Sequence, residues 1–268
     1  MGMAPAAKSG YPRPMANPLK TFATPLQVVM TLVLYVQLSI AGGVAATPGV
    51  WVALELHDVL TAGDLPRIVN IGIACICALL AYFIYALTVI WVVPLFRIIA
   101  PGTPEGRYSY YSFKGMQWAS YNALILLVRY TCINFLRVTP FINLFHRLMG
   151  MKIGRRVQIN TAVIGDSNLI EIGDDTVIGG DVTLVAHSAE RGDLVTGRVR
   201  IGSRVTVGLM VVIFPGCEIG DGAVIAANAV LQKNTKIGPG EVWGGVPARR
   251  IGQKPPAPDT APPDAPAE

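Results

Sequence analysis

His187 is the one histidine between residues 151 and 252, and three polar residues are candidates to orient its imidazole ring. An imidazole can take a proton from a hydroxyl or an amine and return it near neutral pH. Such a base needs a partner for its other ring nitrogen. Asp166 and Asn168 precede His187 by about 20 residues and Glu190 follows it closely, so all three are candidate partners. The competing interpretation is a surface histidine in a turn, with these residues at corners or in a loop.

A six-residue repeat predicts the elements that position His187. Large apolar side chains recur at every sixth position from 201 to 243, and a small or β-branched residue follows four positions after most of them. The large residues are Ile201, Val207, Ile213, Ile219, Ile225, Leu231, Ile237 and Trp243. No helix repeats at six, and a plain amphipathic strand repeats at two. Short strands joined by tight corners satisfy this period, and three of them form one triangular coil, so stacked coils are predicted to build a solenoid.

The repeat has two irregularities. It opens at Ile153, slips in phase between Ile164 and Ile172, and is interrupted from about residue 188 to 198. The polar residues and glycines of the interruption predict an exposed loop pushed out between strands, and His187 directly precedes that loop. After the solenoid, predicted over 151–252, the Pro/Ala-rich stretch 253–268 is expected to be disordered.

The repeats resemble the hexapeptide-repeat acyltransferases. Besides the repeats, the likeness rests on three runs: Ile172-Gly173-Asp174-Asp175, Val182 to His187, and Trp243-Gly244-Gly245-Val246-Pro247-Ala248-Arg249. The resemblance implies a left-handed parallel β-helix, a homotrimer with active sites between protomers, and acetyl-coenzyme A or another acyl-coenzyme A as donor. It also implies that His187 is the general base on the acceptor. The sequence has no Ser-His-Asp order or nucleophile-elbow motif, and Cys217 is expected to point inward, so direct transfer of the acyl group is expected.

The same resemblance places the coenzyme in a groove between subunits, near the later coils. The corresponding positions here are Gly208, Ala226, Lys233, Trp243, Arg249 and Arg250. The cations among them suit the coenzyme phosphates, and a backbone N–H near Gly208 suits the oxyanion. Solvated corner charge is the alternative for the cations. Some left-handed β-helices are zinc carbonic anhydrases with three histidine ligands, but a single histidine in the repeats does not support a metal site.

The first hundred residues indicate a membrane region. The chain is 52% hydrophobic and 15% charged, with a mean hydropathy of +0.48. Leu26–Ala46 and Ile68–Phe96 carry no charge and are long enough to cross a bilayer, so 25–100 is predicted to hold two transmembrane helices. A cleaved signal peptide is the alternative for the first. Positive charge flanks the pair, which predicts a multi-pass protein of the inner (cytoplasmic) membrane with its β-helix in the cytoplasm.

Residues 101–150 are predicted to form an interfacial helical region. From Met116 to Met149 the chain is apolar but is interrupted by basic residues, namely Arg129, Arg137, His146 and Arg147. Because arginine at mid-bilayer is costly, two interfacial helices broken near Pro140, with arginines reaching lipid phosphates, fit better than a third span. Packing of this segment against the base of the solenoid is an alternative, and both arrangements can hold together.

Nucleic-acid binding is not expected, since the basic residues behind the net charge of +5 are scattered. Residues 1–24 are expected to be a mobile basic tail in the cytoplasm. The four cysteines form no CxxC pair and are expected to be structural.

These features predict a membrane-anchored O-acetyltransferase that acts on a membrane-proximal hydroxyl acceptor, such as a glycan or a lipid-linked precursor. Two alternatives remain open. One is a non-catalytic trimeric scaffold that organises membrane partners. The other is an accessory module of peptide synthesis, because the segment from Tyr108 through Trp118 and Arg147 to Gly154-Arg155-Arg156-Val157 resembles membrane-associated terminal domains of nonribosomal peptide synthetases.

Overall fold

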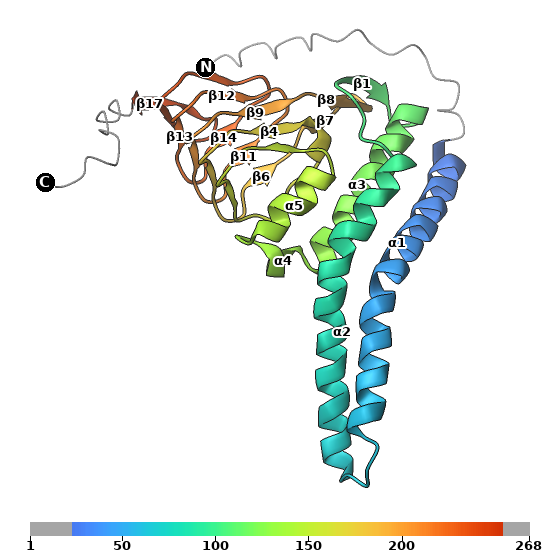
Figure 1. Cartoon of the computed structure of the whole chain (residues 1–268). Coiled ribbons are helices and arrows are strands. Elements are labelled where there is room, and N and C mark those ends of the chain that lie inside the picture. Colours follow the sequence, from blue (N-terminus) through green and yellow to red (C-terminus); the bar gives the residue numbers. More distant parts are fainter. Residues whose placement is uncertain (1–22, 254–268) are drawn as a thin grey trace, which may run out of the picture.

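The computed structural model describes residues 23–253 as a helical part followed by a β-solenoid. The expected basic tail and the expected Pro/Ala-rich tail therefore fall on residues 1–22 and 254–268, outside the described residues. Figure 1 shows a long hairpin of two helices that extends away from the solenoid, with three shorter helices between them. The core is continuous from the base of the hairpin to the last coils.

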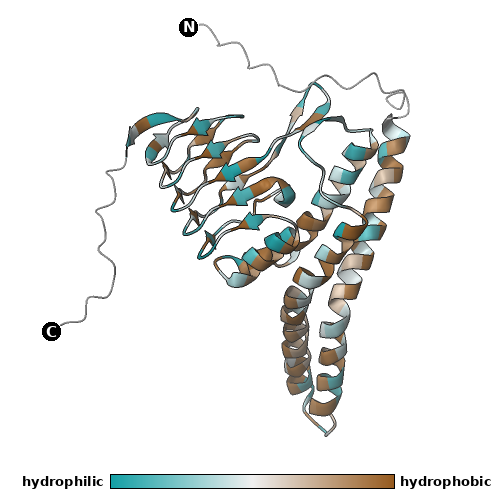
Figure 2. Cartoon of the chain, turned by 45° about the horizontal axis from the view of Figure 1, so that its top comes forward, coloured by the Kyte–Doolittle hydropathy of each residue, from teal (hydrophilic) through white to brown (hydrophobic). Residues whose placement is uncertain are grey.

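The hairpin consists of α1 (Ala23–Leu60) and α2 (Arg67–Leu95), followed by the 3₁₀ turn η2 (Phe96–Ile98). Helix α1 continues past the uncharged stretch Leu26–Ala46 to Leu60, and only residues 61–66 connect the two helices. Most of the hairpin is hydrophobic (Figure 2), and many of its large apolar side chains are exposed, such as Leu54 and Leu79, both at 61%. By length and composition, each helix could cross a membrane.

Three helices connect the hairpin to the solenoid: α3 (Phe113–Thr131), α4 (Ile133–Leu136) and α5 (Pro140–Leu148). The predicted break near Pro140 is present, because Thr139 caps α5 and Pro140 occupies its first turn. Arg147 donates to the carbonyls of Ile153 and Gly154. The arginines of this region therefore do not all point to lipid, and packing against the base of the solenoid is part of the arrangement.

The solenoid is a three-sided prism of parallel strands, as the six-residue repeat predicts. One side contains β2 (Lys152–Ile153), β4 (Ile170–Ile172), β9 (Val199–Ile201), β12 (Glu218–Ile219) and β15 (Lys236–Ile237). The second contains β3 (Gln158–Ile159), β5 (Val177–Ile178), β10 (Thr206–Val207), β13 (Val224–Ile225) and β16 (Glu241–Gly244). The third contains β6 (Thr183–Leu184), β11 (Val212–Ile213) and β14 (Val230–Leu231). The last strand, β17 (Arg249–Gln253), pairs antiparallel with β16.

The register between coils follows the period. Val207 lies beside Ile225 and Ile213 beside Leu231, so one coil is three hexapeptides long. The large apolar residues of these strands point inward and are buried together with the small residues that follow them, such as Cys217 and Ala223. Burial of this apolar ladder is the main source of stability for the prism.

The interruption of the repeat is an ordered β-hairpin, whereas the sequence predicted an exposed loop. Strands β7 (His187–Glu190) and β8 (Asp193–Thr196) pair antiparallel, and β1 (Gly106–Ser109) adds to β8 to complete a three-stranded sheet. Arg191 and Gly192 form the turn with φ values of 52° and 84°, a pair of positive values that suits a tight hairpin turn. The connector before α3 thus anchors the hairpin that carries His187.

Candidate functional site

The structure places His187 against Asp166. Nδ1 of His187 lies 2.5 Å from Oδ2 of Asp166, and the His187 side chain is 28% exposed while that of Asp166 is 1% exposed. An ionised carboxylate accepts a hydrogen bond, so Nδ1 carries the proton in this contact. In the neutral ring, the free lone pair is then on Nε2. This is the tautomer that a general base requires.

Asp166 is fixed by its backbone and by four further contacts. It lies where the repeat slips in phase, in a left-handed conformation with a φ of 53°, which aspartate tolerates better than most residues. Its Oδ1 accepts from Nε1 of Trp118 at 2.7 Å and from Nδ2 of Asn122 at 3.0 Å. Its Oδ2 also accepts from the backbone N–H of Ala186 at 3.1 Å, and its own N–H donates to Oδ1 of Asn122 at 3.0 Å. These donors offset the cost of burying a carboxylate.

The imidazole ring is held from two sides. The Trp118 ring meets it edge to face, with the centroids 4.9 Å apart. His187 opens β7 and pairs with Thr196 of β8, whose hydroxyl donates to the carbonyl of Pro104 at 2.9 Å. Segments before α3, within α3 and within the solenoid therefore meet around one histidine.

Glu190, another predicted partner of His187, points elsewhere. Residues three apart on a strand lie on opposite faces, so Glu190 and His187 diverge from β7. Glu190 accepts from Arg107 at 2.5 Å and from Lys233 at 2.8 Å. The hydrogen bond from Lys233, together with the charges of Lys233 and Arg107, holds the pKa of the Glu190 carboxyl below its usual value, although burial opposes this shift. Glu190 thus ties the hairpin to a later coil.

The contacts of Asn168 are also with other residues than His187. Its Nδ2 donates to the carbonyl of Thr103 at 2.9 Å, and its backbone N–H donates to the hydroxyl of Tyr121 at 3.1 Å. Asn168 thus joins the segment before α3 to the solenoid. Of the three predicted partners, the structure brings only Asp166 into contact with His187.

The glycine and alanine predicted beside the coenzyme take part in the ladder between coils. The N–H of Gly208 donates to Ile225 and that of Ala226 to Trp243, both at 2.8 Å. The N–H of Gly208 is therefore not available to an oxyanion, which corrects that expectation for this residue. A Cβ at Gly208 would approach the backbone nitrogen of Ala227 to 2.6 Å, so glycine is needed there for coil stacking.

The remaining predicted coenzyme residues divide into two places. Lys233 lies beside the β7–β8 hairpin through its bond to Glu190. Trp243, Arg249 and Arg250 belong to β16 and β17, at the far end of the prism from α5 (Figure 1). Trp243 donates to Glu241 at 2.9 Å, and Arg250 pairs with the same carboxylate at 3.4 Å. Arg249 is exposed and donates to the carbonyl of Ala248 at 2.8 Å.

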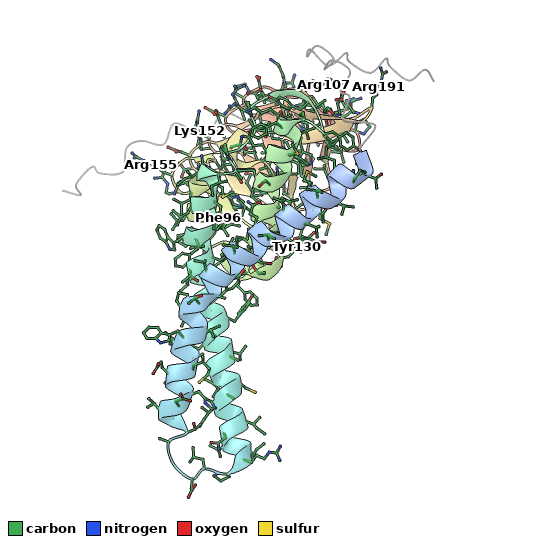
Figure 3. All side chains as sticks on the ribbon, turned by 90° about the vertical axis from the view of Figure 1, so that its right-hand side faces the viewer. Phe96, Arg107, Tyr130, Lys152, Arg155 and Arg191 are labelled. Carbon is green, nitrogen blue, oxygen red and sulfur yellow. The ribbon has the colours of Figure 1, made fainter. Side chains whose placement is uncertain are left out.

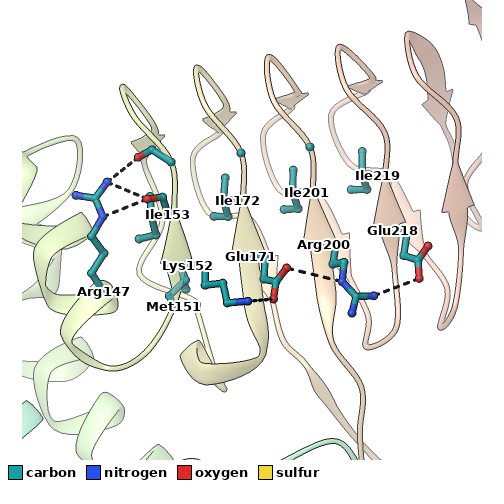
Figure 4. Close-up of a pocket in the computed structure, with 13 residues that line it drawn as sticks. Arg147, Met151, Lys152, Ile153, Glu171, Ile172, Arg200, Ile201, Glu218 and Ile219 are labelled. Atoms are coloured by element: carbon teal, nitrogen blue, oxygen red, sulfur yellow. Dashed lines mark hydrogen bonds and ion pairs between the residues drawn. The ribbon is translucent and has the colours of Figure 1, made fainter.

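A shallow hollow on the first side of the prism does not include His187. It runs over β2, β4, β9 and β12, as Figure 4 shows. Its charges are paired with one another: Glu171 accepts from Lys152 at 2.9 Å, and Arg200 contacts Glu218 at 3.4 Å. Such pairs stabilise neighbouring coils and leave little net charge to bind a ligand.

The described residues hold no cluster of metal ligands, and the thiol in the prism is not suited to be a nucleophile. Within residues 23–253, no three histidine, cysteine, aspartate or glutamate side chains converge as metal ligands. Cys217 is buried in the prism, and burial raises the pKa of its thiol to about 11. A thiol of this kind remains protonated near neutral pH, so it is not suited to carry an acyl group.

Known proteins that resemble this chain are hexapeptide-repeat proteins. The family described as the hexapeptide repeat of succinyl-transferase matches residues 198–233. The candidate acetyltransferase YvoF of Bacillus subtilis (strain 168) is 33% identical over 135 residues, which are 48% of this chain and 77% of YvoF. The galactoside O-acetyltransferase of Escherichia coli (strain K12) is 37% identical over 107 residues, 37% of this chain and 52% of that enzyme.

Among solved structures, the hexapeptide-repeat-containing acetyltransferase VCA0836 of Vibrio cholerae, complexed with acetyl-coenzyme A, is 28% identical with a TM-score of 0.37. The match covers 40% of this chain and 62% of that one. The chain thus spans about half of the galactoside enzyme and about three fifths of VCA0836.

Proposed function

Because the chain belongs to the hexapeptide-repeat acyltransferase family, we propose that it transfers an acetyl group from acetyl-coenzyme A to a hydroxyl acceptor, with His187 as general base. The observation that carries this proposal is the contact between His187 and the buried carboxylate of Asp166. The family's left-handed β-helix is the expected hand of the prism.

The reaction needs one proton relay. Nε2 of His187 takes the proton of the acceptor hydroxyl while its oxygen attacks the thioester carbonyl carbon. Asp166 stabilises the imidazolium through Nδ1–H. When the tetrahedral intermediate collapses, the C–S bond breaks, and the imidazolium returns its proton to the thiolate of the coenzyme. An acetyl ester and free coenzyme A are the products, with no acyl-enzyme.

The exposed cations of the last coil would serve the donor. Arg249 and Arg250 are exposed and suit coenzyme phosphates. Lys233 lies nearer to the hairpin, and its pairing with Glu190 leaves less of its charge for a phosphate. The oxyanion would require a donor other than the N–H of Gly208.

A homotrimer, which the resemblance to this family implies, would place a second copy of the chain beside the site. An exposed apolar corner supports the assembly: Leu209 and Met210 follow β10 and are each 58% exposed. Monomeric proteins rarely leave large apolar side chains grouped in this way, and packing of prisms around a threefold axis would cover them.

The helical hairpin would anchor the enzyme in the inner membrane as a two-span protein, with the prism in the cytoplasm. Tyr82, Phe83 and Phe135 form an aromatic cluster with ring centroids 5.6–6.0 Å apart. Figure 3 shows Tyr130 near the level at which the hairpin leaves the rest of the molecule, with Phe96 further toward the prism. Aromatic residues at this level suit a membrane–water interface, with the prism on one side of it.

The packing of α1 supports a retained first helix. Ala41 and Ala45 are fully buried, and Gln37 accepts from Ser120 of α3 at 2.6 Å. Removal of α1 as a signal peptide would expose this interface. An enzyme held at the membrane in this way would meet a membrane-proximal acceptor, either a glycan or a lipid-linked precursor.

Release of the coenzyme thiol tests the function. Purified full-length protein in nanodiscs is incubated with acetyl-coenzyme A and a panel of hydroxyl acceptors. His187→Ala is expected to reduce the rate about 10³-fold, whereas the control His57→Ala, in the outer part of the α1–α2 hairpin, leaves it unchanged. An unchanged rate in His187→Ala would overturn the mechanism. Failure of the wild-type protein to bind acetyl-coenzyme A would favour the non-catalytic scaffold.

A further inference from the structure

Helix α3 reaches the active site with two side chains. Trp118 and Asn122 are four residues apart and therefore share one face of the helix. They lie 48 and 44 residues before Asp166 in the chain, outside the repeats, yet both donate to the same carboxylate oxygen.

The two residues fix the Asp166 carboxylate in different ways. Trp118 donates through Nε1 and also packs its ring against the imidazole. The Asn122 side chain binds Asp166 twice, as donor to Oδ1 and as acceptor from the backbone N–H, both at 3.0 Å. Its Nδ2 also donates to the carbonyl of Trp118 at 3.1 Å, which orients the amide. The carboxylate therefore cannot rotate away from His187 without breaking several hydrogen bonds.

Other contacts of α3 have no part in this network. Ser120 donates to Gln37 of α1, and Tyr121 donates to the carbonyl of Met149 at the base of the prism. These bonds hold the helix in place and would suffice for a structural role. The convergence of Trp118 and Asn122 on the one carboxylate that contacts the imidazole is a separate feature.

We propose that Trp118 and Asn122 are positioning residues for acyl transfer, so that α3 belongs to the active site as much as the prism does. The proposal rests on the proposed function of His187 as general base. Their donors hold Oδ2 of Asp166 toward Nδ1 of His187 while the imidazolium forms.

Kinetics of two variants test this role. Trp118→Phe keeps an aromatic ring and removes the N–H donor, and Asn122→Ala removes both contacts of the amide with Asp166. Each is expected to lower kcat for thiol release about 10- to 100-fold, with KM for acetyl-coenzyme A unchanged. The matched control, Ser120→Ala, removes a 2.6 Å hydrogen bond from the same helix and is expected to retain wild-type kcat.

The pH profile distinguishes positioning from support of the fold. Without these donors, Oδ2 is no longer held against Nδ1 and the imidazolium loses stabilisation, so the acidic limb of the rate profile is expected to move to lower pH. The elements packed around His187 also carry Tyr110, which packs on Trp118, and the ion-paired residues Arg107, Glu190 and Asp193. All are retained in both variants. Wild-type kcat and an unmoved limb in both variants, with only a lower thermal midpoint, would show a purely structural role.

A chemical probe separates this proposal from the proposed function. The chain has three histidines, and His146 is fully buried, so in a His57→Gln background diethyl pyrocarbonate reports on His187. Trp118→Phe and Asn122→Ala are expected to move the pH midpoint of modification downward, whereas Ser120→Ala does not. If wild-type protein releases no thiol, the proposed function fails and this shift still tests positioning. A midpoint identical to wild type in both variants overturns the positioning role, and Trp118→Phe keeps the test valid if Asn122→Ala fails to fold.

Discussion

The two halves of the prism obey the six-residue repeat to different degrees. From 199 to 244 each strand pairs with the strand one coil away, and backbone N–H groups such as that of Gly208 are used in the ladder. From 160 to 198 the chain contains the phase slip around Asp166, the short helix η3 (Ser167–Leu169) and the β7–β8 hairpin. His187 and Asp166 both lie in the irregular half. Regular coils give the molecule its shape, and departures from the repeat bring polar side chains together.

The two halves also differ in what their interiors contain. In residues 199–244, all of which the structure describes, the buried side chains are apolar. The irregular half buries polar groups, including Thr161, Asp166 and Ser167. Thr161 donates to the carbonyl of Val182 at 2.7 Å, and Ser167 contacts Nδ1 of His146 in α5 at 2.9 Å. Hydrogen bonds to the helices stabilise the irregular half, whereas apolar contacts between coils stabilise the regular half.

The largest expected effect is a loss of kcat when the carboxylate of Asp166 is replaced. Asp166→Asn keeps the size of the side chain but removes its charge, so the amide no longer stabilises an imidazolium. We expect kcat to fall about 10³-fold, measured as thiol release from acetyl-coenzyme A. Glu190→Gln is the comparison, since Glu190 contacts Arg107 and Lys233 and should retain activity within about threefold of wild type. Equal losses in the two variants would contradict the assignment of Asp166.

A change in the regular half should alter stability and leave catalysis intact. Ile225 is 1% exposed inside the prism, and Ile225→Ala is expected to lower the free energy of unfolding by about 2–5 kcal/mol, measured by denaturant titration. Val224→Ala, at the outward neighbour on the same strand, is the control and should cost far less. A kcat in folded Ile225→Ala protein more than tenfold below wild type would show that the regular half also positions the site.

The smallest effect concerns the hairpin ion pairs. Pairing with Lys233 holds the pKa of Glu190 below its ordinary value of 4.5, so the pair contributes stability above that pH and loses it as the pH falls through the lowered pKa. Glu190→Gln is therefore expected to cost up to about 1 kcal/mol at pH 7. The difference in thermal midpoint from wild type should shrink below pH 4.5. A difference that stays constant through this range would rule out the ion pair as its source.

Much of the solenoid was predictable, because its period is local. Each hexapeptide repeats the same inward apolar residue, so Ile213 and Ile219 indicate their strands without knowledge of distant contacts. The end of α1 was not predictable from charge alone, because the packing of two helices extends α1 beyond Ala46. The ordered hairpin was missed because Arg191-Gly192 lacks the Asn-Gly or Asp-Gly signal that marks such turns in a sequence.

The site was predictable only in part. His187 could be selected because it is the one histidine in the repeats, but three polar residues competed to be its partner. Trp118 and Asn122 were not identified at all, since an aromatic and an amide four residues apart on a helix carry no signal of their own. Their role depends on α3 lying against Asp166, a contact across more than 40 residues of chain.

The amino-acid sequence by itself determined the prism, the apolar helices and the family resemblance, because each follows from the spacing of residue types along a short stretch. Only the tertiary structure decided which acid meets His187 and which side chains hold that acid. Hydrogen bonds act over about 3 Å, and the atoms that meet at Asp166 come from helix α3 and from the β7–β8 hairpin. Distances of that size are set by the packing of whole elements, which the local pattern does not record.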